Sequence, residues 1–257
     1  MKQIFKSTVI DVLLSKSSLY ILLFGSFFLM IGYGLKFTIG ISSGNSYHDI
    51  SQYQTVIYLH IFLYIFYATI LAGCSSDLED EIKERFHEIT LIYIPRRKYF
   101  LTKYIAYLFS YFSLLMLIGF FGSILCKILL GITLNFKFFL GLVFISFNTA
   151  FLLSLFLIFS LKNSPRGGSL FAFLLYIFFS LLNSKTIISW ITGFERISRI
   201  ISTLSPSVFW LQNEWLRFGL GWGFSDRFWK YFLNLLFYIF LSFFVLSKRI
   251  NRYECKA

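Results

Sequence analysis

The chain has 257 residues, of which 57% are hydrophobic and 22% aromatic, and its formal net charge is +12. One soluble core of this length could not bury so much apolar surface, so the composition excludes an ordinary soluble globular protein. The positive charge alone could indicate a nucleic-acid partner. Lysine and arginine beside membrane-spanning helices, however, are the usual means of fixing orientation in a bilayer. We therefore predict the lipid bilayer as a partner and no nucleic acid.

Six apolar runs are long enough to cross a bilayer as helices, because about 20 residues with a rise of about 1.5 Å each match a hydrocarbon thickness of ~30 Å. In chain order the runs are Leu19 to Ile41, Thr55 to Cys74, Tyr104 to Cys126, Phe138 to Leu161, Ser169 to Trp190 and Tyr231 to Ser247. We expect an all-α integral membrane protein with six transmembrane helices. No internal repeat or soluble segment divides the chain, so residues 1–257 are expected to form a single transmembrane domain.

The distribution of lysine and arginine predicts the orientation of these spans. If both termini are cytoplasmic, most basic residues lie on the inner side of the membrane, as the positive-inside rule requires. Most of the remainder lie in the long connection 185–230, where the rule is weaker. The basic residues therefore favour cytoplasmic N and C termini.

The amino-terminal segment, residues 1–18, has the pattern of an amphipathic helix. One face of this helix carries Phe5, Val9, Val12 and Leu13, and the other carries Lys2, Lys6, Asp11 and Ser15. The pattern predicts a helix that lies in the inner membrane interface with its lysines near anionic headgroups. The alternative is a frayed tail.

The longest connection, residues 185–230, is more than a plain loop. Its apolar residues recur at helical spacing, at Phe194, Ile197, Ile201 and Leu204, and four tryptophans follow, at Trp210, Trp215, Trp222 and Trp229. Tryptophan prefers the headgroup zone of a membrane. We therefore expect short helices that enter the outer interface.

The segment SSDLEDEIKERFHEITLIYIPRRKYFLTKY, residues 75–104, holds six of the twelve acidic residues of the chain. Ser76 and Glu79 have the spacing of a capping box, which predicts that a helix begins there. An apolar stripe continues through Leu78, Ile82, Phe86, Ile89 and Tyr93, and Pro95 then disfavours helix at Ile94. We expect an amphipathic helix over 76–94 on the cytoplasmic side. It is either a docking surface for a cytoplasmic protein or a solvated loop helix without a partner.

The end of this segment, YIPRRKYFLTK at residues 93–103, resembles a segment of the permeases of the type-2 ABC exporter family. In that family a proline, a Ser-Arg pair, a Leu-Leu pair and a Gly-Lys end follow the coupling helix in that order, and Arg96, Leu101 and Lys103 match the pattern. The preceding acidic helix, which ends in Glu88 and Thr90, is similar to the coupling helix that docks on the ATPase subunit.

The chain departs from the family pattern at three points: Pro95 directly precedes Arg96, Thr102 replaces the glycine, and no Gly-Thr pair lies ahead of the proline. The layout is nevertheless similar in its interfacial amino-terminal helix, six spans, coupling helix and short re-entrant helices between spans five and six. LSPSVFW, residues 204–210, resembles the Ser-Pro-aromatic element that precedes the last span in the family.

The resemblance implies a permease subunit of an ABC exporter, which moves an amphipathic peptide, lipid or drug-like substrate outward. The implied partners are an ABC ATPase subunit and a second permease copy or a related permease. The implied location is the bacterial cytoplasmic (inner) membrane. No G-x-x-x-x-G-K-[ST] phosphate loop occurs in the sequence, so we expect no enzyme activity and no cofactor on this chain, with ATP and Mg bound by the partner ATPase.

The resemblance also gives candidate site residues. Those expected to dock on the ATPase are Glu79, Asp80, Glu84, Phe86 and Glu88. Those expected to form a clamp at the membrane surface are Arg96, Arg97 and Lys103. No catalytic residue is predicted, and no metal site is predicted because Cys74, Cys126 and Cys255 lack metal-ligand spacing.

Two other functions remain open. A polytopic membrane enzyme acting on lipids would need acid, base or metal-ligand groups near one membrane face. Lys36, His60, Lys127 and Lys137 have no acidic partner in the sequence, and His60 is expected to be a hydrogen-bonded packing residue. A non-transporting immunity membrane protein would bind a toxin and would need no cytoplasmic docking surface, so the acidic helix argues against it.

Overall fold

The computed structural model describes residues 1–40, 47–83, 93–134, 136–162, 164–183, 195–219 and 224–251, and regular secondary structure in these ranges is entirely helical. The helices are α1 (Lys2–Leu14), α2 (Lys16–Gly40), α3 (Tyr47–Lys83), α5 (Arg96–Leu130), α6 (Phe136–Ser160), α7 (Pro165–Asn183), α9 (Glu195–Leu204), α10 (Val208–Gly219) and α11 (Phe228–Asn251). The expected all-α fold is therefore confirmed for the described part of the chain.

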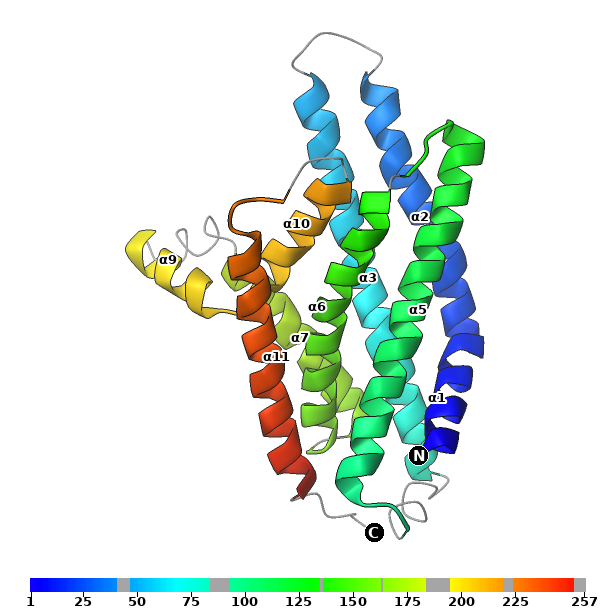
Figure 1. Cartoon of the computed structure of the whole chain (residues 1–257), viewed down its shortest axis with the longest axis vertical. Coiled ribbons are helices and arrows are strands. Elements are labelled where there is room, and N and C mark those ends of the chain that lie inside the picture. The colour runs from blue at the N-terminus through cyan, green and yellow to red at the C-terminus, as the bar shows by residue number, and fades with distance from the viewer. Residues whose placement is uncertain are drawn as a thin grey trace.

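The long helices run up and down along one axis (Figure 1). We call the end of the bundle that holds Met1, the Lys83 end of α3 and the start of α5 the basal end, and the opposite end the distal end. α3, α6 and α11 run toward the basal end, whereas α2, α5 and α7 run away from it (Figure 1). This alternation is the arrangement expected of successive membrane crossings.

Five helices in the described ranges are long and apolar enough to span a membrane. These segments are Leu59–Ile82, Arg96–Leu130, Phe136–Ser160, Pro165–Asn183 and Phe228–Ile250. α1 and α2 make a sixth candidate if they are counted as one span bent by 53°. The structure therefore agrees with a helical membrane protein of five or six spans.

The bend between α1 and α2 has a local cause at Ser15. This residue leaves the helical conformation, with φ −60° and ψ 144°. Its hydroxyl donates to the carbonyl of Val12 at 2.9 Å and accepts the Ser18 backbone N–H at 3.1 Å. A serine oxygen that accepts an amide three residues later is the usual amino-terminal cap of a helix, so α2 begins here as a new helix.

The predicted amino-terminal helix is present, but its buried face differs slightly from the expected one. Ile4, Thr8 and Val12 are buried, while Phe5 and Val9 are half-buried. α1 packs against α5, where Phe5 meets Phe109 with ring centroids 5.9 Å apart. The contact with α5 rotates the buried face about one residue toward the amino terminus.

A helix start at Ser76 is not found. α3 runs without a break from Tyr47 to Lys83, so Ser76 lies inside a helix and does not cap one. The capping-box prediction is wrong because the apolar residues before Ser76 and the acidic residues after it belong to one continuous helix. The remainder of the predicted coupling helix falls largely on residues 84–92, outside the described ranges.

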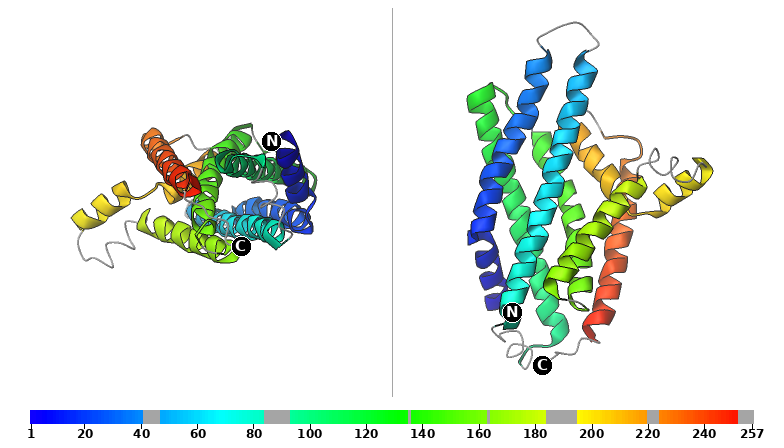
Figure 2. Two further views of the ribbon diagram at one scale, coloured as in Figure 1. Left: turned by 90° about the horizontal axis from the view of Figure 1, so that it is seen from below. Right: turned by 180° about the vertical axis from the view of Figure 1, so that it is seen from behind.

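The short helices predicted in the connection 185–230 are present as α9 and α10. α9 stands to the side of the bundle in both views of Figure 2. α10 instead packs against α6, α7 and α11, and buries Val208, Leu211 and Gln212 completely. α10 is therefore part of the core and not a surface helix.

Phenylalanines join α6 to its neighbours. Phe144 makes edge-to-face contacts with Phe228 and Phe232 of α11, at centroid distances of 5.0 and 5.6 Å. Phe147 also meets Phe232, at 5.0 Å. Such pairs favour packing beyond the area they bury. These side chains serve the α6–α11 interface.

Gly168 sets the close approach of α7 to the end of α6, and its replacement is our first prediction. A Cβ atom at this position would lie 2.6 Å from the backbone nitrogen of Ser160 and 2.8 Å from its Cα. Because backbone atoms cannot rotate away, Gly168→Ala should lower the free energy of unfolding by about 1–3 kcal/mol. Thermal unfolding of the purified protein in mild detergent measures this change.

Ser169→Ala is the matched control, since it removes one hydroxyl in the same turn of α7 and adds no atom near Ser160. An unfolding midpoint for Gly168→Ala that equals the control would contradict the close α6–α7 packing.

Candidate functional site

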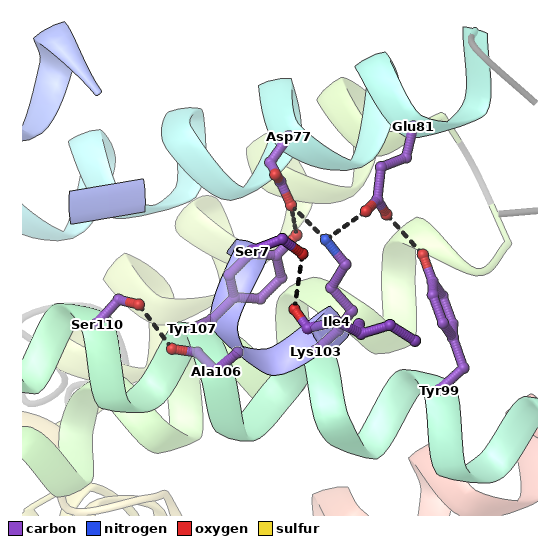
Figure 3. A network of polar contacts seen from close by, with 9 residues as sticks. All are labelled: Ile4, Ser7, Asp77, Glu81, Tyr99, Lys103, Ala106, Tyr107 and Ser110. Carbon is purple, nitrogen blue, oxygen red and sulfur yellow. Dashed lines mark hydrogen bonds and ion pairs between the residues drawn. The ribbon is translucent and has the colours of Figure 1, made fainter. Parts of the chain in front are cut away.

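A buried lysine bound by two carboxylates joins α3 to α5 near the basal end (Figure 3). Lys103 of α5 places its Nζ 2.9 Å from Asp77 Oδ2 and 2.6 Å from Glu81 Oε1, both on α3. Tyr107 donates its hydroxyl hydrogen to Asp77 Oδ2 at 2.5 Å, and Tyr99 donates to Glu81 Oε2 at 2.6 Å. We call these five residues the lysine cluster.

Helical spacing positions all five side chains. Asp77 and Glu81 are four residues apart on α3, and Tyr99, Lys103 and Tyr107 are four residues apart on α5. Residues with this spacing share one face of a helix and lie one turn apart. The two acidic side chains on one face of α3 therefore meet the three donor side chains on one face of α5, and these long side chains bridge the two helices.

Burial makes this cluster energetically important. The Lys103 side chain is only 1% exposed, whereas those of Asp77 and Glu81 are 17% and 18% exposed. An ammonium group taken out of water is costly unless it is paired and hydrogen-bonded. The two carboxylates supply that compensation. If α3 and α5 separated here, the buried ammonium group would lose both of its carboxylate partners.

The amino-terminal helix covers the lysine cluster. Figure 3 shows Ile4 and Ser7 of α1 beside Lys103 and Asp77. The Ser7 hydroxyl donates to the carbonyl of Ile4 at 3.1 Å, so it is satisfied within α1. α1 thus closes one side of the cluster and contributes no charge to it.

The residues predicted to dock on an ATPase are only partly described. Glu79 forms an ion pair with Arg166 at the start of α7, with Oε2 and Nε 2.7 Å apart. Because the Arg166 side chain is 76% exposed, this pair is screened by solvent and adds little stability. Asp80 is exposed at the basal end. Glu84, Phe86 and Glu88 lie outside the described residues.

The residues predicted to form a membrane-surface clamp occupy two different environments. Arg96 and Arg97 are exposed in the first turn of α5. Lys103 instead lies in the interior, in the lysine cluster. The structure therefore does not bring these three side chains together on one surface.

Sequence reasoning missed Asp77, Glu81, Tyr99 and Tyr107 as partners of Lys103. The detectable signal was the matching four-residue spacing in the two segments. In the sequence, Glu81 also has the four-residue spacing for an ion pair with Arg85, and such a local pair can be drawn without knowing which helices are neighbours. The pairing across α3 and α5 requires the tertiary structure.

A second polar network lies nearer the middle of the bundle, around His60 of α3. Its Nδ1 lies 3.2 Å from Gln212 Oε1, and its Nε2 lies 2.8 Å from Asn213 Oδ1, both on α10. Gln212 Nε2 donates to the hydroxyl of Tyr176 at 2.7 Å. The expectation that His60 is a hydrogen-bonded packing residue is confirmed. We call His60, Gln212, Asn213 and Tyr176 the histidine network.

Asparagines anchor the start of α10 from two other helices. Asn148 of α6 donates to the carbonyl of Val208 at 3.0 Å. Asn183 of α7 accepts the backbone N–H of Phe209 at 3.2 Å and donates to the Ser205 hydroxyl at 2.7 Å. Side-chain amides thus satisfy backbone groups at a helix start that is buried among apolar side chains.

Neither network has the arrangement of a metal site. In the described part of the chain, no group of three or more His, Cys, Asp or Glu side chains could hold a metal ion. Cys74 and Cys126 are buried free thiols. The chemistry that these networks support is the fixing of helices against one another.

Comparison of the chain with models of known protein families, with curated protein sequences and with solved structures finds no match. Functional inference therefore depends on the geometry of this chain.

Replacement of the buried lysine tests the lysine cluster. Lys103→Met leaves Asp77 and Glu81 without their cation. This should lower the free energy of unfolding by about 3 kcal/mol. The value is at the lower end of the cost of breaking a buried pair, because both carboxylates are partly exposed to solvent. The matched control, Lys98→Met, removes an exposed lysine of the same helix and should change stability by less than about 0.5 kcal/mol. Thermal unfolding in detergent compares the two variants.

A triple variant distinguishes lost charge compensation from lost packing. Adding Asp77→Asn and Glu81→Gln to Lys103→Met removes all three charges and should restore most of the lost stability. Equal stability of the Lys103→Met and Lys98→Met proteins, or a triple variant less stable than Lys103→Met, would argue against the cluster.

Proposed function

We propose that the chain is the membrane-spanning permease subunit of an ABC exporter of the type-2 family, driven by ATP hydrolysis on a separate subunit. A second permease copy or a related permease would complete the membrane pore. The lysine cluster is the observation that carries this proposal, because it ties α3 to α5 at the basal end, next to the acidic segment that joins them.

A motor protein that pushes on the segment between α3 and α5 must move both helices together if its work is to reach the membrane. Two helices held by a buried lysine and two carboxylates respond as one body, since separating them would leave charges unpaired. Hinge and shear motions in proteins occur between packed units of this kind and leave the units themselves intact. The lysine cluster is therefore suited to pass motion from the basal end into the bundle.

The charge at the basal end also fits a protein partner. Asp80 is exposed, and the residues that follow α3 include Glu84 and Glu88 in the sequence. Complementary charge across an interface steers encounter and disfavours wrong partners. In this proposal, basic residues of the ATPase contact Asp80, Glu84 and Glu88, beside the exposed cations Arg96, Arg97 and Lys98 at the start of α5.

α10 adds a second line of support. It is a short helix held inside the bundle between α9 and α11, at the position where the family has a re-entrant helix. Its polar contacts to α3, α6 and α7 tie the distal half of the bundle to the same helix, α3, that reaches the basal end.

The first test is recovery of an ATPase with this protein. The tagged chain is purified from its native membrane in mild detergent, and the proteins that accompany it are quantified by mass spectrometry. The proposal predicts an ABC ATPase in near-equal amount. Glu84→Lys with Glu88→Lys should reduce that recovery by roughly tenfold or more, because like charges brought together at an interface cost several kcal/mol.

The matched control is Asp49→Lys with Asp226→Lys, which makes the same two charge reversals toward the distal end. It should leave recovery unchanged. Purification of the chain without any ATPase in several detergents, or equal loss in both variants, would overturn the proposal and favour a lipid-acting enzyme or an immunity protein.

A further inference from the structure

A small cavity lies where the end of α9 meets the starts of α10 and α11. α11 begins at its end away from the basal end (Figure 1). Its volume is about 50 Å³, enough for several waters or for one phosphate group. The lining residues are Ser202, Thr203, Ser207, Trp210, Arg227, Lys230, Tyr231 and Asn234. We call this cavity the distal pocket.

The distal pocket carries two positive charges. Arg227 and Lys230 line it from the start of α11, and both are exposed. Within the described ranges, neither forms an ion pair. The nearby carboxylate of Glu214 is held by the backbone N–H of Ser225 at 2.8 Å and by the Ser225 hydroxyl. The pocket therefore offers cations to an anion from outside the described chain.

The walls of the distal pocket are fixed before any ligand binds. Asn234 accepts the backbone N–H of Ser207 at 2.9 Å and donates to the carbonyl of Thr203 at 3.3 Å. Trp210 stacks on Tyr231 with ring centroids 5.3 Å apart and planes 8° from parallel. These contacts join all three helices, so binding here would require little ordering of the protein.

We propose that the distal pocket binds the phosphate of an anionic phospholipid from the membrane leaflet at the distal end. Arg227 and Lys230 supply charge-assisted contacts to the phosphate oxygens. Trp210 and Tyr231 are amphipathic side chains of the kind enriched at the level of lipid headgroups. The pocket lies at the start of the spanning segment Phe228–Ile250, which is where a headgroup would be.

A path for an acyl chain leads away from the pocket along α11. Phe237, Leu241 and Val245 follow Asn234 at steps of three or four residues, so they share its helix face. They are 62%, 44% and 37% exposed, which leaves an apolar track below the cations. A free phosphate would make no use of this track, whereas a phospholipid would fill both the pocket and the track.

The test is a lipid titration of the full-length purified protein followed by native mass spectrometry. Phosphatidylglycerol is added to the wild type and to the Arg227→Gln/Lys230→Gln variant. Loss of both cations should weaken phosphatidylglycerol binding about tenfold or more, because the phosphate oxygens lose their charge-assisted hydrogen bonds. The charge-conserving variant Arg227→Lys/Lys230→Arg should retain most of the binding.

The matched control is Lys127→Gln/Lys137→Gln, which removes two exposed lysines near the same end of the bundle, outside the pocket. It should bind phosphatidylglycerol as the wild type does. Phosphatidylcholine, which has no net charge, should bind the wild type more weakly than phosphatidylglycerol does.

Three results would overturn the proposal. Equal loss of binding in the pocket and control variants would show attraction to net charge alone. Unchanged binding in the Arg227→Gln/Lys230→Gln protein would place the lipid elsewhere. Displacement of phosphatidylglycerol by millimolar inorganic phosphate, with equal thermal stabilisation by phosphate alone, would identify a free-anion site. None of these results bears on whether an ATPase binds at the basal end, so this inference and the proposed function can fail separately.

Discussion

A charged amine inside an apolar bundle must be compensated where it lies, and the basal half of this molecule is built around that constraint. Lys103 is buried between Asp77 and Glu81, and two tyrosines complete the hydrogen bonding of the carboxylates. The lysine cluster fixes the register of α3 against α5. α1 covers the cluster, and its bend at Ser15 lets α2 leave in a new direction to pack on the same two helices. Three helices, α1, α3 and α5, thus meet around one buried side chain.

In the distal half of the bundle, buried polar groups are also paired, but there the paired groups are neutral. The first backbone N–H groups of α10 have no partner in a preceding helical turn, and Asn183 accepts one of them, from Phe209. Asn148 donates to the carbonyl of Val208 in the same turn. His60 then joins α3 to the middle of α10. Buried atoms without a protein partner remain beside this network at Tyr67 and Asn148, among the described residues. Such atoms are usually satisfied by water, so we expect ordered water in the interior around α10.

The sequence predicted the helices well, because the membrane imposes a length and an apolar composition that can be counted along the chain. The short helices α9 and α10 were also foreseen, from the spacing of Ile197, Ile201 and Leu204 and from the tryptophans that follow. The sequence did not predict that α3 continues through Ser76, since a capping pattern cannot be distinguished from acidic residues that simply extend a long helix. It also could not predict that Lys103 is buried. That outcome depends on which helices become neighbours, and local spacing carries no information on the partner of a helix face.

In the proposed function, the acidic end of α3 receives force from the ATPase, and the lysine cluster and α10 pass it into the bundle. The central claim is that a cytoplasmic ATPase contacts the basal end. Its most direct test is photo-crosslinking in living cells from a photoreactive amino acid placed at Asp80, which is exposed at that end, and at Asp226, which is exposed just before α11 begins. A crosslink from position 80, but not from position 226, to a protein with an ATP-binding cassette would support the claim. No such crosslink from position 80, or the same products from both positions, would contradict it.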